Sequence, residues 1–218
     1  MLGPIITKNM RTLLLAFIFL LSLHACEQAG QQDILSNLIQ QDTFLNEIAF
    51  NPAHKVQIVY TQIDRSEDNS PAFTTHTFQL DTSSYFYPAS TVKMPAAFLA
   101  LEKINELGIS GLEKDSKFIT SAATAPQTAV TKDTSKADSL PSIAHYIKKI
   151  FLVSDNDAYN RLYEFVGQED LNKSLWEKGF NKTRIIHRLS EPGYDKVTNK
   201  HTNPVTFYKN DKILYHLS

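Results

Sequence analysis

The first polar–apolar pattern lies in residues 32–49, where apolar side chains recur every three or four positions. This spacing predicts a helix with one apolar face. Asn51-Pro52 follows directly, and the residue before a proline avoids helical backbone, so we expect the helix to end there. The apolar positions are Ile34, Leu35, Leu38, Phe44, Leu45 and Ile48.

Two segments with a different period follow. Residues 54–64 and 72–84 alternate apolar and polar positions and are rich in β-branched and aromatic residues, which is typical of strands. The polar sequence SEDNSP separates them and predicts a hairpin turn.

A more apolar segment begins at Ser90. It is apolar on nearly all sides through Leu101, which predicts a helix buried in the middle of a domain, and Gly108 marks its end. Residues 110–141 are polar and predict irregular structure.

Helical patterns return over 142–153, 157–166 and 168–178, and from residue 181 the chain is expected to form loops. The order helix, hairpin, buried helix and helical cluster predicts an α+β domain.

Composition excludes several classes of function. The formal net charge is −1 and 42% of the residues are hydrophobic, so we expect a globular protein without a nucleic-acid partner. The seven histidines never fall at HxxxH or HxH spacing, and the seven glycines form no phosphate-binding loop. We therefore expect neither a metal nor another cofactor.

The N-terminus resembles a bacterial lipoprotein signal. Lys8 and Arg11 precede an apolar run over 13–23 that is too short to span a bilayer, and "LHAC" then resembles a lipobox ending at Cys26. We expect residues 1–25 to be removed, and Cys26 to carry lipid that anchors an exported protein on the periplasmic side of a membrane. The alternative is an ordinary signal peptide followed by a buried cysteine.

The start of the buried helix carries candidate chemistry. Ser90 and Lys93 form a Ser-x-x-Lys motif, and residues three apart share one helix face, so the amine can reach the serine hydroxyl. A serine needs a neighbouring base to act as a nucleophile, and a partly buried lysine loses its charge more readily than a solvated one. A chain with many serines and lysines contains about one such pair by chance, so the motif needs support.

That support comes from Ser154-Asp155-Asn156, which follows a predicted helix. By itself the tripeptide could simply cap the next helix. Together, however, Ser-x-x-Lys and Ser-Asp-Asn form the signature of class A β-lactamases and penicillin-binding proteins. Through "YPASTVKMPAA" and "FLVSDNDAYNRLYEFVG", residues 26–218 resemble the N-terminal portion of a class A serine β-lactamase domain over nearly their whole length.

The resemblance implies an antiparallel sheet flanked by helices, an additional all-helical subdomain, and a monomer that acts on β-lactams. It implies that Ser90 is the nucleophile, that Lys93 is its base, and that Ser154 passes a proton to the leaving nitrogen. Asn156 would hold the substrate's amide carbonyl and the lysine.

Hydrolysis also needs a base that activates water, which in class A enzymes is a loop glutamate. Glu191 lies where the resemblance places that loop, but two residues separate it from Arg188, whereas the family usually has one. The alternative is a solvated glutamate without a catalytic role.

One expected motif is missing. The family's Lys-Thr-Gly would lie beyond Ser218, so we expect the last strands of the sheet to be missing from this chain. Two alternative functions stay open: a D-Ala-D-Ala peptidase or related serine hydrolase, and a non-catalytic penicillin-binding or remnant domain.

Overall fold

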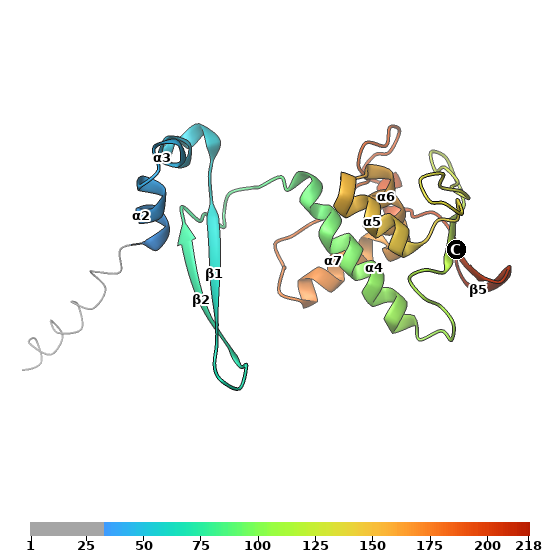
Figure 1. The fold of residues 1–218 in the computed structure, drawn as a ribbon. Coiled ribbons are helices and arrows are strands. Elements are labelled where there is room, and N and C mark those ends of the chain that lie inside the picture. The colour runs from blue at the N-terminus through green and yellow to red at the C-terminus, as the bar shows by residue number, and fades with distance from the viewer. Residues whose placement is uncertain (1–32) are drawn as a thin grey trace, which may run out of the picture. The chain divides into compact units, whose positions relative to one another are not determined.

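A computed structural model describes residues 33–218 of the chain. The chain divides into two compact units, of which the first ends at Phe86 and the second comprises Tyr87–Ser218 (Figure 1). Residues 1–25 and Cys26, predicted to be a signal peptide and a lipidation site, lie outside the described residues.

The first unit begins with two short helices, α2 (Ile34–Gln40) and α3 (Thr43–Phe50). The sequence predicted one helix over 32–49, which is wrong because Asp42 starts a new helix: its carboxylate accepts a hydrogen bond from the backbone N–H of Leu45 at 2.9 Å. Aspartate is a favoured N-cap because it satisfies an unpaired amide. The short 3₁₀-helix η1 (Pro52–His54) follows.

The predicted hairpin is confirmed. Strands β1 (Ile58–Arg65) and β2 (Pro71–Phe78) pair antiparallel, with Ile58 opposite Phe78 and Arg65 opposite Pro71. The small core of this unit consists of Ile39, Ala49 and Phe78, with Leu35, Val56 and Ile58 packed against them.

The second unit is organised around α4 (Lys93–Leu107), which the 3₁₀-helix η2 (Ala89–Val92) precedes. The predicted helix start at Ser90 is thus a 3₁₀ turn, and the α-helix itself begins at Lys93. It ends at Gly108, which adopts the left-handed conformation (φ 59°) that suits glycine.

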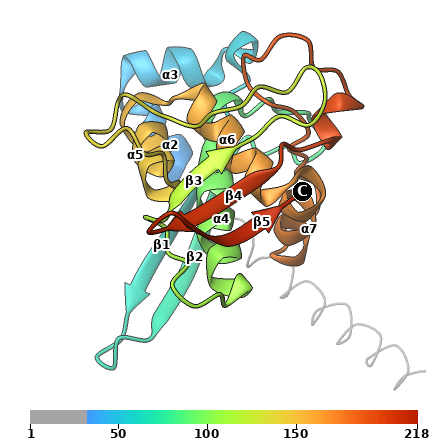
Figure 2. The same cartoon turned by 90° about the vertical axis from the view of Figure 1, so that its right-hand side faces the viewer.

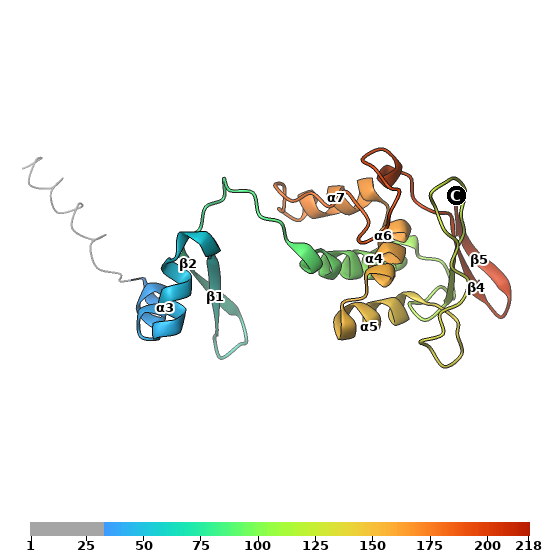
Figure 3. The ribbon, with the colours of Figure 1, turned by 90° about the horizontal axis from the view of Figure 1, so that it is seen from above.

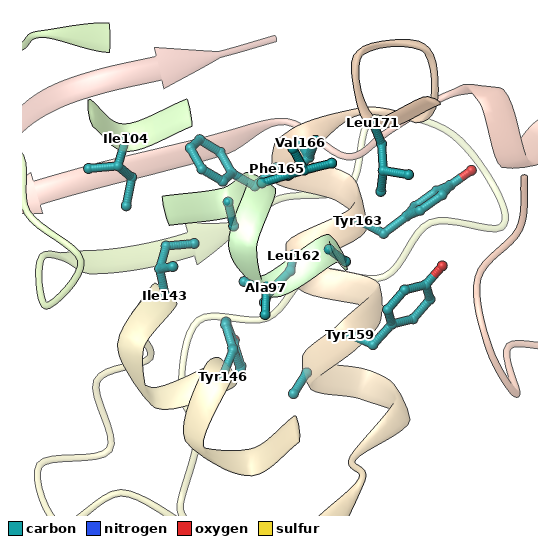
Figure 4. Packing of buried hydrophobic residues seen from close by; sticks show 14 of the residues in the cluster. Ala97, Ile104, Ile143, Tyr146, Tyr159, Leu162, Tyr163, Phe165, Val166 and Leu171 are labelled. Carbon is teal, nitrogen blue, oxygen red and sulfur yellow. The ribbon is translucent and has the colours of Figure 1, made fainter. Parts of the chain in front are cut away.

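Three further helices pack with α4: α5 (Ile143–Val153), α6 (Asn156–Val166) and α7 (Gln168–Glu177) (Figure 3). They agree with the predicted helical segments to within one residue at each end. Every residue of α6 from Ala158 onwards is buried, so this helix forms the centre of the core with α4. Figure 4 shows side chains of Ala97, Leu162, Phe165 and Val166 meeting between the two helices.

A three-stranded antiparallel sheet covers one side of these helices (Figure 2). Its order is β3 (Lys117–Thr120), β4 (Val205–Lys209) and β5 (Lys212–Leu217). Phe118 and Phe207 from the sheet contact the ring of Phe165, with centroids 5.9 and 5.1 Å from it.

This sheet corrects two expectations. Residues 110–141 are not entirely irregular, since β3 lies within them, and the chain after residue 181 is not all loop, since β4 and β5 form a hairpin. The turn residues Asn210 and Asp211 both have positive φ, which these residue types tolerate in tight hairpins.

The helices and antiparallel sheets of the two units confirm the predicted α+β fold. Within residues 33–218, no helix is both long and apolar enough to cross a membrane. The 3₁₀-helix η3 (Thr198–Lys200) lies between α7 and β4 in the chain.

Candidate active site

The geometry around Lys93 brings the first two predicted site residues together. Lys93 begins α4 and is only 2% exposed, whereas Ser90 in the preceding 3₁₀ turn is exposed. The ammonium nitrogen Nζ of Lys93 lies 3.2 Å from Oγ of Ser90. An exposed hydroxyl is therefore in contact with a buried amine.

The same amine reaches the Ser-Asp-Asn turn. Lys93 Nζ lies 2.9 Å from Oγ of Ser154 and 2.6 Å from Oδ1 of Asn156, and it also donates to the backbone carbonyl of Ser154. Two segments more than sixty residues apart therefore meet at one nitrogen atom.

The backbone of that turn explains how it presents its side chains. Ser154 ends α5 in the left-handed conformation (φ 54°), and Asp155 caps α6 by accepting from the N–H of Ala158 at 2.8 Å. The capping alternative is thus true of Asp155. It does not compete with the chemical interpretation, because Ser154 and Asn156 on either side both contact Lys93.

The environment of Lys93 makes its amine easier to deprotonate than that of a solvated lysine. Burial lowers the pKa of the Lys93 amine, and the negative charge of Asp155 offsets only part of this effect. Its hydrogen-bond partners are hydroxyl, carbonyl and amide oxygens, which carry no full charge. A larger fraction of Lys93 can therefore accept a proton at a given pH than of a solvated lysine.

A cluster of charged residues stabilises the Ser-Asp-Asn turn through Asp155. Lys149 on α5 lies 3.2 Å from the carboxylate of Asp155 and 3.0 Å from that of Asp133, which His145 also contacts at 3.2 Å. Burial acts to raise the pKa of Asp133, but hydrogen bonds from Ser135 and Lys149 outweigh it and hold this pKa well below its usual range. An ionised Asp133 thus ties its loop to the helix that carries the turn.

A second buried cluster closes the loop over 189–202. Nε of Arg188 donates to Oε1 of Glu164 at 2.9 Å, and its Nη2 donates to the carbonyl of His201 and to Oδ1 of Asn203 at 3.1 and 3.2 Å. The guanidinium also lies over the ring of Tyr194, 4.1 Å from its centroid. Arg188 therefore joins both ends of the loop to α6.

The chain matches a family model, Beta-lactamase2, described as the Beta-lactamase enzyme family, over residues 32–211. The protein belongs to this beta-lactamase enzyme family. The match makes it a β-lactamase-like serine hydrolase in general terms and agrees with the α+β fold. Among curated proteins, no match was found.

In this beta-lactamase family member, Glu191 forms its ion pair with Arg161 and not with Lys93. Its carboxylate is 3.8 Å from Nη2 of Arg161, a buried residue of α6. Among the described residues, neither Ser90 nor Lys93 has a hydrogen bond or ion pair with Glu191. The structure thus brings together four of the five predicted catalytic and substrate-binding residues, and the roles of all five stay predictions.

The sequence did not identify Ser190. Nδ2 of Asn156 donates to Oγ of Ser190 at 2.8 Å, so the amide of Asn156 is fixed by Lys93 at one end and Ser190 at the other. Ser190 has a positive φ of 55°, which is uncommon for serine. The side-chain amide of Asn160 on α6 holds the preceding residue, Leu189, by donating to its carbonyl and accepting from its N–H. No motif marks Ser190, because its role depends on contacts between distant segments.

Across residues 33–218, no three His, Cys, Asp or Glu side chains lie close enough together to hold a metal ion.

Proposed function

We propose that the protein opens the amide of a β-lactam through an acyl-serine intermediate on Ser90, in the manner of a class A β-lactamase that confers antibiotic resistance. The observation that carries this proposal is the position of Lys93 Nζ, in contact with the hydroxyls of both Ser90 and Ser154. One amine touches both the hydroxyl that loses a proton and the hydroxyl that delivers one.

Acylation begins when neutral Lys93 accepts the proton of Ser90 and Oγ bonds to the lactam carbonyl carbon. The carbonyl oxygen gains negative charge, and the backbone N–H of Ser90, in the first turn of η2, is available to donate to it. Asn156 Nδ2 has two protons, of which one is used by Ser190, so the other can bind the substrate's side-chain amide carbonyl.

The C–N bond then breaks. Ser154 donates its proton to the lactam nitrogen, and protonated Lys93 replaces that proton across the 2.9 Å contact. The products of this step are an ester on Ser90 and a ring-opened amine. Ser154 and Lys93 both return to their starting protonation states.

Release of the product requires a water molecule and a base. We assign the base to Glu191, which follows the residue that contacts Asn156. The ion pair with Arg161 opposes this role, because a carboxylate held by a guanidinium is a weaker base. That pair is the observation that favours a second function, a penicillin-binding protein or D-Ala-D-Ala peptidase that stays acylated by β-lactams.

The test measures acylation and turnover separately on the purified protein. A fluorescent penicillin is expected to label the protein covalently at Ser90, and Ser90→Ala is expected to abolish the label. Ser110→Ala, an exposed serine outside the site, is the matched control and should label normally. Labelling that survives Ser90→Ala would disprove the acyl-serine proposal.

Nitrocefin hydrolysis then decides between the two functions. Continuous turnover that is lost in Glu191→Gln, with labelling retained, supports a β-lactamase. A stable label without turnover supports the penicillin-binding alternative.

We further propose that the protein is an exported lipoprotein, with residues 1–25 as its signal and Cys26 as its lipidated residue. The support is the order of basic residues, short apolar run and "LHAC" in the sequence. Labelled palmitate should be incorporated by the native protein in a bacterial host and not by Cys26→Ser. Absence of label from both would leave an ordinary signal peptide.

A further inference from the structure

A cavity of about 410 Å³ lies along α7 and the segment that follows it, separate from the lysine cluster. Its walls come from α7, from residues 184–186 and from Lys200 in η3. None of its lining residues is Ser90, Lys93, Ser154 or Asn156. Its volume is within the range typical of small-molecule sites.

The charged side chains of this cavity are mostly cationic. Lys173, Arg184 and Lys200 line it from three separate segments, and Glu169 is the one carboxylate in the lining. Within residues 33–218, none of these three cations forms an ion pair with a carboxylate. Like charges gathered without partners repel one another, and a bound anion would remove that repulsion.

The neighbouring cavity provides an internal comparison. It lies on the other side of Lys173 and is lined by Glu102, Glu106, Asp170 and Glu177. There Lys103 is paired with Asp170 at 3.3 Å. The positive charge of the first cavity is thus not a general property of this surface. The neighbouring cavity is lined by four carboxylates, one of which is paired with Lys103.

The uncharged donors of the first cavity are already used by the protein. Both N–H groups of the Gln168 amide donate, to the hydroxyl of Tyr163 and the carbonyl of Ile186 at 2.9 and 2.7 Å. The Asn172 amide donates to the carbonyls of Gln168 and Ile185 at 2.8 and 2.7 Å. The donors left for a ligand are therefore those of the cations, which favour an anion over a neutral polar molecule.

One wall of the cavity is apolar. Trp176 is 39% exposed and Ile186 is 50% exposed, and the indole N–H donates to the carbonyl of Thr183 at 2.8 Å. With that donor used, the exposed part of the indole offers only its ring. The guanidinium of Arg184 lies 5.3 Å from the ring centroid, so charge and aromatic surface are adjacent.

We propose that this cavity is a binding site for a small anion that carries a flat, largely apolar ring, such as an aromatic phosphate or carboxylate. Arg184 and Lys200 bind the anionic group, and the ring of the ligand packs against Trp176 and Ile186. The site is independent of the proposed chemistry at Ser90.

Trp176 is the only tryptophan of the chain, so its fluorescence reports directly on this cavity. Phenyl phosphate is expected to change the fluorescence saturably, and at lower concentration than either inorganic phosphate or benzyl alcohol. Inorganic phosphate has the anionic group without the ring, and benzyl alcohol has the ring without the anionic group. Added salt should weaken the binding. An equal response to either half-ligand, or no saturable response, would overturn the proposal.

Variants then locate the site. Arg184→Gln should weaken phenyl phosphate binding by about tenfold or more, since it removes charged hydrogen bonds. Glu169→Gln should strengthen it, because it removes the one opposing carboxylate. Lys148→Gln, an exposed lysine on α5, is the matched control and should bind as the native protein does. If Lys148→Gln weakens binding as much as Arg184→Gln, the effect is one of net charge and the assigned site is wrong.

Discussion

The two units differ in how much of their apolar surface they bury. In the part of the first unit that the structure describes, the buried core consists of three residues, and Phe73 on the hairpin is 64% exposed. In the second unit, 21 buried apolar residues form one cluster around α4 and α6, and Phe165 is fully buried. Since burial of apolar surface is the main stabilising term, the second unit holds its side chains in fixed positions far more firmly.

The candidate catalytic groups all belong to the better-packed unit. Lys93 begins the central helix, and Asn156 begins the helix that crosses the core. A site that must hold an amine within hydrogen-bond reach of two hydroxyls needs rigid support of this kind. Pairs of matching substitutions, one in each unit, test this contrast directly.

Lysine substitutions should give the largest difference. Lys93→Ala is expected to slow the proposed acylation of Ser90 by about 10²–10⁴-fold, because it removes the proposed activating base. Lys55→Ala in the first unit replaces an exposed lysine and should leave the rate unchanged. The measurement is the rate of labelling by a fluorescent penicillin, and equal rates for both variants would remove Lys93 from the proposed mechanism.

The pH dependence of the native protein sharpens the same prediction. Burial lowers the pKa of Lys93, so the neutral amine becomes more abundant as pH rises, starting below the ordinary lysine value of 10.5. The acylation rate should therefore increase with pH and level off below 10.5. A rate that is independent of pH up to that value would contradict a role for Lys93 as base.

Phenylalanine substitutions test the packing difference. Phe165→Ala should lower the free energy of unfolding by about 3–5 kcal/mol, since it leaves a cavity among Phe118, Phe207 and the helices. Phe73→Ala in the hairpin should change it by about 0.5 kcal/mol or less. Urea denaturation monitored by circular dichroism provides both values, and a larger loss for Phe73→Ala would reverse the contrast.

Arginine substitutions compare a buried with an exposed guanidinium. Arg188→Ala should cost about 3 kcal/mol in unfolding free energy, because it removes one of the two buried guanidinium groups that pair with Glu164, the other being that of Arg161. Arg65→Ala, which loses hydrogen bonds only to Asn69 at the hairpin turn, should cost about 0.5 kcal/mol. Faster proteolysis within the 189–202 loop in Arg188→Ala alone would support the assignment of Arg188 as the residue that closes this loop.

The smallest effect is expected at Ser190. Ser190→Ala removes the hydrogen bond that fixes Asn156, and a net loss of about 1 kcal/mol corresponds to a several-fold slower acylation. Ser190→Thr keeps the hydroxyl and should retain most of the rate. Ser190→Gly relaxes the positive φ but also removes the hydroxyl, so a native rate in this variant would show that the backbone, not Oγ, matters.

Much of the fold could be predicted from the sequence because its helices have clear periodicity. The patterns over 142–153 and 168–178 match α5 and α7 closely, and the alternation in the hairpin matches β1 and β2. Strand β3 could not, because it has only four residues and is stabilised by pairing with β4, about 85 to 91 positions later. The hairpin of β4 and β5 was missed although its strands are joined by the turn residues Asn210 and Asp211.

The candidate site shows the same division. Ser90, Lys93, Ser154 and Asn156 could be predicted because they belong to two short motifs with fixed spacing. Ser190 could not, since its only relevant partner is 34 residues away and no spacing rule connects them. The arrangement of Arg188 with Glu164 likewise depends on how the loop packs on α6, a property that no local pattern in the sequence records.

The turn between α5 and α6 has a consequence for how this chain can vary in length. Two residues separate the helices, and the tripeptide that starts there both ends one helix and begins the next. An insertion or deletion at this point would rotate Asn156 away from Lys93 and remove the cap of α6 together. Length changes among relatives are therefore expected away from this junction, which keeps its two residues.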